Sequence, residues 1–148
     1  MLSTINNLRE IARRCQAGEA LDDSLARWLG SSLEQFLVRR YRTIEDALGI
    51  RAPRGGIPWW LEEAMRQRDA ALRNLADQMF GALSPTAQAK RIYTLAVRYC
   101  SSSWRHDSNS ELMPLNYRGK STEWLWRAFK SGAPMPIGER QLRHILAR

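Results

Sequence analysis

The stretch PWWLEEAMRQRDAALRNLADQMFG, residues 58–81, decides the fold class of this chain. Its apolar residues recur at spacings of three and four, which is the pattern of one buried side of an α-helix. Pro58 is tolerated in the first turn of such a helix, and Gly81 is well placed to end it. The buried side expected from this spacing consists of Leu61, Ala64, Met65, Leu72, Leu75 and Met79.

Helical spacing continues on both sides of this stretch, and no segment shows the alternation that indicates a β-strand. The signals that bound the other helices are Gly18, Asp22 or Asp23, Thr43, Gly49, Ser84 with Pro85, Ser121 or Thr122, Gly132 and Glu139. The sequence therefore predicts an all-α fold, a small bundle of six or seven helices. Its core is expected to contain Leu25, Leu29, Leu33, Leu61, Leu72, Leu75, Ile92 and Leu95.

The clearest break in the helical pattern is RAPRGG, residues 51–56. One proline and two glycines within six residues do not continue a helix. The break indicates where the chain is subdivided. We expect an N-terminal helical segment at 1–50, a linker at 51–57, and a basic helical segment at 58–148 that shares one core with the first.

Basic residues are concentrated in the second half of the chain, whose 148 residues carry a net charge of +8. Residues 1–86 hold 12 Lys+Arg and 11 Asp+Glu, whereas residues 87–148 hold 11 Lys+Arg and 4 Asp+Glu, a net of +7. Such asymmetry favours nucleic acid or another polyanion as a partner.

The sequence also indicates where the protein acts. No run approaches the roughly 18–20 apolar residues that cross a membrane, and the N-terminus lacks the continuous apolar core of a signal peptide. Cys15 and Cys100 fall in apolar helical faces, where buried free thiols are ordinary. We expect a cytoplasmic protein without a membrane partner.

The last two predicted helices, STEWLWRAFKSG at 121–132 and GERQLRHILAR at 138–148, look like a helix-turn-helix. In that motif the second helix lies in the major groove of DNA, and its early residues contact base edges. We expect its apolar residues Leu142, Ile145 and Leu146 to face the preceding helix. That orientation leaves the polar side of the last helix available to nucleic acid.

The residue types on this polar side suit duplex DNA. Arginine pairs with guanine O6 and N7, glutamine pairs with adenine N6 and N7, and basic side chains outside the groove contact phosphates. The expected base-contacting residues are Arg140, Gln141, Arg143 and His144. The expected phosphate-contacting residues are Lys120, Arg127 and Lys130.

Two alternatives remain open for the C-terminal pair and for the protein. The connection from Ser131 to Gly138 is longer than the usual turn of about 3–4 residues, so the last helix is also explained as a solvated helix that closes the fold. The alternative function is that of a protein-interaction module, for example a phage-encoded modulator of a host or phage complex. Tryptophans in close pairs favour an interface with either protein or nucleic acid, because adjacent helix positions do not share one narrow buried stripe. The candidate partner surface consists of Trp59, Trp60, Trp124 and Trp126.

No pattern in the sequence indicates catalysis, a cofactor, a small-molecule substrate or a metal. Zinc sites normally show close pairs of ligands, whereas Cys15, Cys100, His106 and His144 are scattered. The segment 104–120 contains His106, Asp107 and Glu111, but it has neither a nucleophile elbow nor a glycine-rich phosphate loop. We expect a protein that is not an enzyme.

The chain resembles a group of short Arg- and Trp-rich helical proteins from phage and proteobacterial genomes that have no assigned activity. The resemblance rests on the ARWL motif at 26–29, the Trp pair that opens the long helix at 59–60, and RQLRHIL at 140–146. It implies a bacterial or phage setting and implies no active site.

Overall fold

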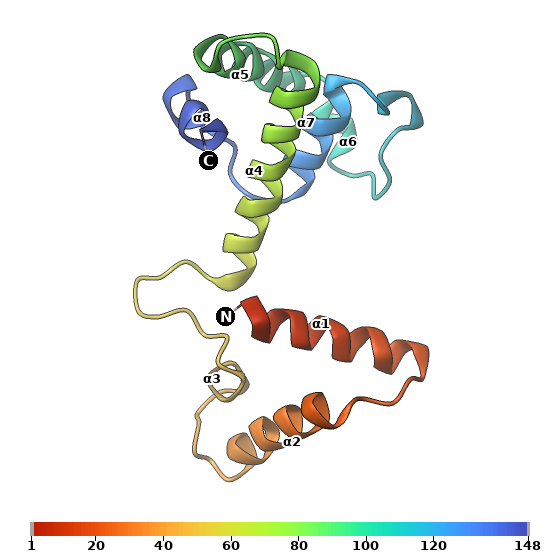
Figure 1. Cartoon of the computed structure of the whole chain (residues 1–148), viewed down its shortest axis with the longest axis vertical. Coiled ribbons are helices and arrows are strands. Elements are labelled where there is room, and N and C mark those ends of the chain that lie inside the picture. Colours follow the sequence, from red (N-terminus) through yellow and green to blue (C-terminus); the bar gives the residue numbers. More distant parts are fainter. Residues whose placement is uncertain (1, 148) are drawn as a thin grey trace. The chain divides into compact units, whose positions relative to one another are not determined.

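The structure is a computed structural model that describes residues 2–147, and all regular elements in this range are helices, with no strand (Figure 1). Its elements are α1 (Leu2–Ala17), α2 (Asp23–Leu37), α3 (Ile44–Leu48), α4 (Trp59–Phe80), α5 (Pro85–Ser101), α6 (Trp104–Asp107), the 3-10 helix η1 (Leu115–Tyr117), α7 (Ser121–Lys130) and α8 (Glu139–Leu146). The predicted small all-α bundle is confirmed. The number of helices exceeds the prediction because α6, a single turn, is too short to show periodicity.

The chain divides into two compact units, residues 1–59 and 60–148, and the boundary follows the predicted linker at 51–57. Within the linker, the backbone N–H of Gly56 donates to the Pro53 carbonyl at 2.7 Å, and Gly55 has φ of +77°. A Cβ on Gly56 would lie 2.9 Å from Pro53, so this turn requires glycine at that position as well. That the two predicted segments share one core stays a prediction.

Several helix boundaries form as their sequence signals predict. The side chains of Asp22, Thr43 and Ser84 each accept the backbone N–H of the third residue that follows, at 2.9, 3.2 and 3.3 Å. These bonds satisfy donors that have no partner inside the helix. Gly49 ends α3 with φ of +70°, the left-handed conformation that glycine adopts without strain.

The start of α7 differs from the prediction that Ser121 or Thr122 caps it. Its N-cap residue is Lys120, whose side chain makes no capping bond. A carboxylate oxygen of Glu123 instead accepts the backbone N–H of Gly119 at 2.8 Å. The acidic side chain of the first turn thus reaches back over the helix end, and the helix starts one or two residues earlier than expected.

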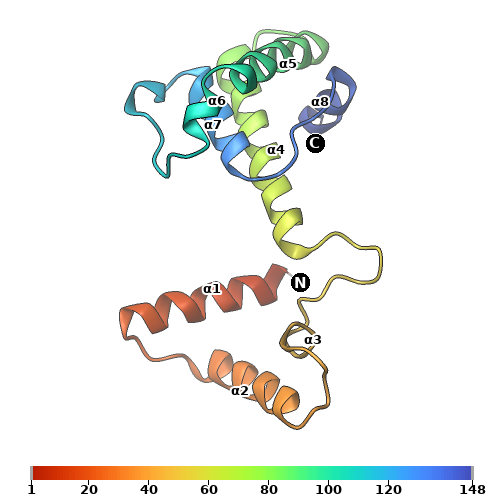
Figure 2. The same ribbon diagram turned by 180° about the vertical axis from the view of Figure 1, so that it is seen from behind.

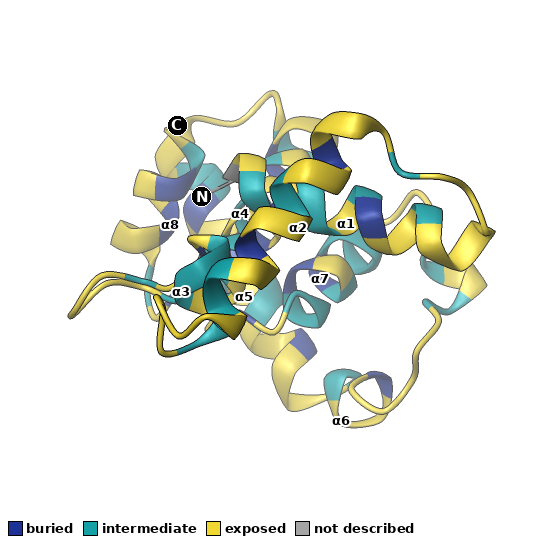
Figure 3. Ribbon diagram, turned by 90° about the horizontal axis from the view of Figure 1, so that it is seen from below, coloured by how far each residue is buried: buried dark blue, intermediate teal, exposed yellow. Residues whose placement is uncertain are grey.

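The core of the second unit is built by α4, α5, α7 and α8. Leu72, Leu75 and Ile92 are completely buried, as their spacing predicts, and Figure 3 colours the buried positions of these helices. Leu61 and Leu95 are half-buried. The buried cluster consists of Ala71, Leu72, Leu75, Ala76, Ala89, Ile92, Tyr99, Leu125, Ala128, Leu142 and Ile145.

A charged residue belongs to the buried side of α4. Arg68 is only 4% exposed, and its guanidinium donates to the carbonyl of Pro134 in the connection between α7 and α8. The same group donates through Nε and Nη2 to the Asp69 carboxylate, at 2.8 and 2.6 Å. Arg68 thereby fixes the path of the connection that leads into α8.

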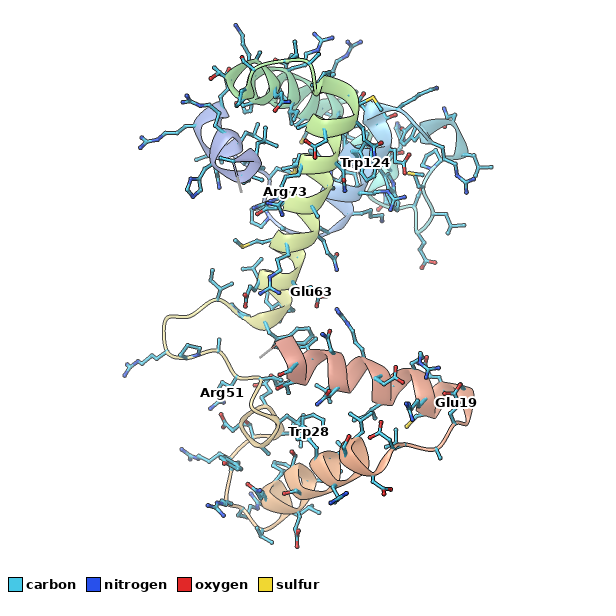
Figure 4. All side chains as sticks on the ribbon, in the orientation of Figure 1. Glu19, Trp28, Arg51, Glu63, Arg73 and Trp124 are labelled. Atoms are coloured by element: carbon cyan, nitrogen blue, oxygen red, sulfur yellow. The ribbon has the colours of Figure 1, made fainter. Side chains whose placement is uncertain are left out.

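The first unit consists of α1, α2 and α3 and buries fewer large side chains. Leu25 is buried as predicted, and Leu29 is half-buried. Figure 4 shows Trp28 pointing from α2 into the space between the three helices. The prediction that Leu33 belongs to the core is wrong: Leu33 is 41% exposed, because the neighbouring Ser32, 6% exposed, takes the buried position of that turn.

None of the helices described between residues 2 and 147 combines the length and the apolar character that a membrane crossing requires.

Candidate nucleic-acid interface

The four residues that the sequence assigns to base contacts lie together on α8. Arg140, Gln141, Arg143 and His144 are all exposed and line one shallow hollow, together with Ile137 and Gly138. They gather because Leu142 and Ile145, 1% and 6% exposed, hold the opposite side of the helix in the core. The amphipathic pattern of this short helix therefore sets the direction in which its polar side chains point.

The arginines and the glutamine of α8 differ in whether their side chains already form hydrogen bonds within the protein. Among the described residues, none forms an ion pair or a side-chain hydrogen bond with Arg140 or Arg143. Gln141 uses its Oε1 to accept the backbone N–H of Ile137 at 3.2 Å. A pairing of Gln141 with adenine would then use the second lone pair of Oε1 together with the amide N–H.

The packing of α8 differs from the helix-turn-helix expectation. The main contact of α8 is with α5, and Figures 1 and 2 show α7 and α8 on opposite sides of α4. In a helix-turn-helix, a turn of about 3–4 residues brings the two helices directly together. Here the connection 131–138 is long enough to carry the chain past α4, so the expected packing of Leu142, Ile145 and Leu146 on the preceding helix is not the main contact.

The C-terminal end of α8 is joined to α4. Nη1 of Arg73 donates to the carbonyl of Ile145 at 3.3 Å, and Figure 4 labels Arg73 on α4. A cation at this end of a helix also interacts favourably with the helix dipole. Together with the contact between Arg68 and Pro134, this bond ties both ends of the α8 segment to one rigid helix.

The three residues that the sequence assigns to phosphates lie on or next to α7, away from α8. Arg127 pairs with Glu123, with 2.9 Å between Nη2 and Oε1, and lies 5.4 Å from the ring of Trp124. Lys130 donates to the carbonyl of Ser108 at 3.0 Å. Lys120 is exposed. The structure thus divides the seven predicted residues into one group on α8 and one group on the far side of α4.

Arg127 and Lys130 border a groove between α4 and α7, to which Gln67 and Asn74 of α4 contribute polar side chains. Trp124 and Trp126 line this groove and are half-buried, and Figure 4 labels Trp124. Their indole N–H groups are buried and have no hydrogen-bond partner among the described residues. The sequence did not indicate this groove, because it depends on which faces of two distant helices meet.

The other predicted tryptophan pair opens α4. Trp60 is 58% exposed, whereas Trp59 is half-buried. This difference follows from the ~100° rotation between neighbouring helix positions, which prevents both rings from sharing one stripe. A large exposed aromatic side chain of this kind is typical of interaction surfaces.

The segment 104–120 is organised by a buried carboxylate that sequence reasoning did not identify. Asp107 is 7% exposed and accepts hydrogen bonds from the hydroxyl groups of Tyr99, at 2.6 Å, and Tyr117, at 2.9 Å. Burial and the bond to Asp107 raise the pKa of Tyr99 well above its usual value, and the same two causes raise the pKa of Tyr117. Asp107 therefore acts as a structural acceptor in this fold.

The candidate metal ligands do not come together. No group of three or more His, Cys, Asp or Glu side chains within the described part of the chain could hold a metal ion. The prediction that Cys15 and Cys100 are buried is wrong, because both are exposed. For Cys100, the buried position of that turn is taken by the neighbouring Tyr99.

Comparison of the chain with protein-family models, with curated proteins and with solved structures finds no match.

Proposed function

We propose that this chain is a non-catalytic nucleic-acid-binding protein of bacterial or phage origin, which acts in the cytoplasm and contacts duplex DNA through the exposed side of α8. The observation that supports this proposal is the hollow at α8, where Arg140, Gln141, Arg143 and His144 lie side by side. Two of these side chains are arginines that no described carboxylate neutralises. The net charge of +7 over residues 87–148 adds a general attraction for phosphates.

The separation of α7 from α8 changes the roles within this proposal. A helix that reads bases needs flanking phosphate contacts on the same side of the protein. Lys120, Arg127 and Lys130 lie across α4 from α8, so we assign them to a second, weaker contact with the nucleic-acid backbone. The α8 residues are expected to carry sequence preference, and the α7 residues are expected to carry general affinity.

Fluorescence anisotropy with labelled duplex DNA, single-stranded DNA and RNA at several salt concentrations tests the proposal. Log affinity for duplex DNA is expected to fall with log salt by about 0.9 for each phosphate neutralised. Duplex DNA should be bound more tightly than the other two. Equal absence of binding to all three at low salt would remove the proposed function.

Single substitutions distinguish the two kinds of contact. Arg140→Ala or Arg143→Ala should cost about 1–3 kcal/mol on a preferred sequence and relax specificity at one base pair. Lys120→Ala should weaken binding to all sequences alike and flatten the salt slope by about one unit. If the folded arginine variants bind every duplex as the parent does, α8 is a solvated helix that closes the fold.

A second candidate function is a protein-interaction module, and the exposed Trp60 favours it. An indole that is 58% exposed on the first turn of a 22-residue helix presents a large rigid surface. Tryptophan is enriched among the residues that dominate binding energy at protein interfaces. Trp60→Ala with unchanged nucleic-acid affinity but reduced capture of a defined partner would favour this candidate.

A further inference from the structure

The end of α2 carries apolar side chains and unpaired positive charge on the same surface. Leu37 and Val38 are 75% and 68% exposed, and Leu33 and Tyr41 are 41% and 36% exposed. Three exposed arginines lie among them. We call this the α2-end surface, which consists of Leu33, Leu37, Val38, Arg39, Arg40, Tyr41 and Arg42.

The arginines of this surface differ from three other arginines of the first unit. Arg13, Arg14 and Arg51 each pair with at least one carboxylate, at distances of 2.7–3.0 Å. In contrast, no described residue forms an ion pair or a side-chain hydrogen bond with Arg39, Arg40 or Arg42. The one acidic residue between positions 31 and 43 is Glu34, and it pairs with none of them. Three positive charges are therefore left without a counter-charge in the folded unit.

One of these arginines occupies a position that suits glycine. Arg39 follows the C-cap of α2 with φ of +62°, and it is the only non-glycine residue with positive φ among those described. Its N–H donates to Phe36 O, and the N–H of Arg40 donates to Gln35 O, both at 3.0 Å, which is the Schellman arrangement at a helix end. A side chain in this conformation is strained, and such strain is retained mainly where a residue has another role.

The composition of the surface identifies the chemistry of its occupant. Unpaired guanidinium groups attract carboxylates, and exposed leucines favour an apolar stripe on the same partner. Residues 1–59 have a net charge of +2 and residues 60–148 a net charge of +6, so each unit as a whole carries excess positive charge that an acidic partner would complement.

Two other anionic surfaces fit less well. The phosphate backbone of nucleic acid would neutralise the arginines but leave Leu37 and Val38 exposed to water. A helix that binds a membrane surface carries an apolar face along much of its length, whereas here the exposed apolar side chains are confined to the end of α2. A few apolar and arginine anchors at one place are typical of a protein interface.

We propose that the α2-end surface binds an acidic amphipathic helix of a partner protein. The arginines contact glutamate or aspartate side chains of that helix, and Leu33, Leu37 and Val38 contact its apolar side. This inference does not depend on DNA binding by α8, because the two surfaces belong to different units of the chain.

Fluorescence anisotropy of the full chain with designed peptides tests this inference. The probe is an acidic 18-residue helix with leucines at three- and four-residue spacing and glutamates beside them. The comparison probes are a peptide of the same composition in scrambled order and a peptide with lysine in place of glutamate. Two further binding partners are tested in the same way: vesicles of phosphatidylserine and phosphatidylcholine, and duplex DNA.

The amphipathic acidic peptide should bind at least tenfold more tightly than the scrambled one. The double variant Arg40→Glu/Arg42→Glu should lose at least tenfold in affinity for it and gain affinity for the lysine peptide. Arg54→Glu/Arg105→Glu changes the net charge equally at two exposed residues outside the surface, and it should bind as the parent does. Leu37→Ser should weaken binding, whereas Leu115→Ser, at an equally exposed position, should not.

Arg39→Gly separates binding from folding. Relief of the positive φ should raise the denaturant midpoint of the protein, while loss of the guanidinium should weaken peptide binding about threefold. A variant that is both more stable and a weaker binder cannot owe its loss to unfolding. Equal binding of the acidic and scrambled peptides, charge reversal without effect, or vesicle binding in the absence of peptide binding would each overturn the proposal.

Discussion

Replacement of Arg68 with methionine is expected to lower the free energy of unfolding by about 2–4 kcal/mol, because it leaves two bonded groups without their donor. Methionine retains much of the apolar stem, so the change mainly removes the charge and the hydrogen bonds. The Pro134 carbonyl and the Asp69 carboxylate would then be left without the guanidinium that bonds both. Urea unfolding followed by helical circular dichroism measures the loss.

A matched substitution on the same helix provides the control. Arg66 pairs with Glu62 on the surface of α4, where the side chain of Arg66 is 46% exposed. Exposed pairs of this kind contribute about 0.3–0.5 kcal/mol, so Arg66→Met should change stability little. A loss below about 1 kcal/mol for Arg68→Met would show that the buried guanidinium does not anchor the connection.

Arg68 also shows why the sequence predicted the helices better than their packing. It lies seven residues after Leu61 and four before Leu72, so the spacing of α4 places it on the buried side. Periodicity based on hydrophobicity excludes a charged residue from that side, although α4 buries it. The group that makes this burial acceptable, the carbonyl of Pro134, lies 66 residues further along the chain. A hydrogen bond between residues so far apart in the sequence leaves no signal in the local sequence around either of them.

The candidate interface was predictable to the extent that it depends on one helix. Arg140, Gln141, Arg143 and His144 come together because the spacing of the two buried residues of α8 fixes which side is exposed. The position of α7 relative to α8 depends instead on the path of residues 131–138, and the expected packing on α7 is not the main contact of α8. The main contacts of α7 and α8 are set by tertiary packing, which overrides the resemblance of their local sequence to a helix-turn-helix.

The α2-end surface illustrates a different limit of prediction from the sequence. The stripe of α2 predicted that Leu33 is buried, because spacing based on hydrophobicity passes over a small polar residue such as Ser32, which takes the buried position next to it. The sequence signal that indicates the surface is the absence of glycine after α2. Arg39 stands where helices commonly end with glycine, and two further arginines follow it within three residues.

Replacement of Asp107 with alanine is expected to destabilise the protein by about 2–4 kcal/mol, because two tyrosine hydroxyls lose a charged acceptor that is buried with them. Tyr99 is 4% exposed and also packs edge-on against Phe129 of α7, with 5.3 Å between the ring centroids. Loss of Asp107 should therefore loosen both the 104–120 segment and its contact with α7. Thermal unfolding and hydrogen exchange of this segment are the measurements.

Alkaline pH is expected to destabilise the cluster that Asp107 forms with Tyr99 and Tyr117. Burial and the bond to Asp107 raise the pKa of both tyrosines in the folded state, while an unfolded tyrosine titrates near pH 10. The contribution of the cluster to stability is therefore fully present below pH 10 and is lost as the pH rises above it. Unfolding midpoints measured between pH 8 and pH 11 should fall at the upper end of this range.

A double-mutant cycle isolates the hydrogen bonds of Asp107 from its other contacts. In a Tyr99→Phe/Tyr117→Phe background there are no hydroxyls left to bond, so Asp107→Ala should cost at least about 1 kcal/mol less than in the parent. Glu111→Ala removes an exposed carboxylate from the same segment and should change stability by no more than about 0.5 kcal/mol. Equal costs of Asp107→Ala in both backgrounds would mean that the carboxylate stabilises the segment through contacts other than the two tyrosines. The long segment between α5 and α7 would then owe its order to the packing of Trp104 on Tyr99 and Phe129.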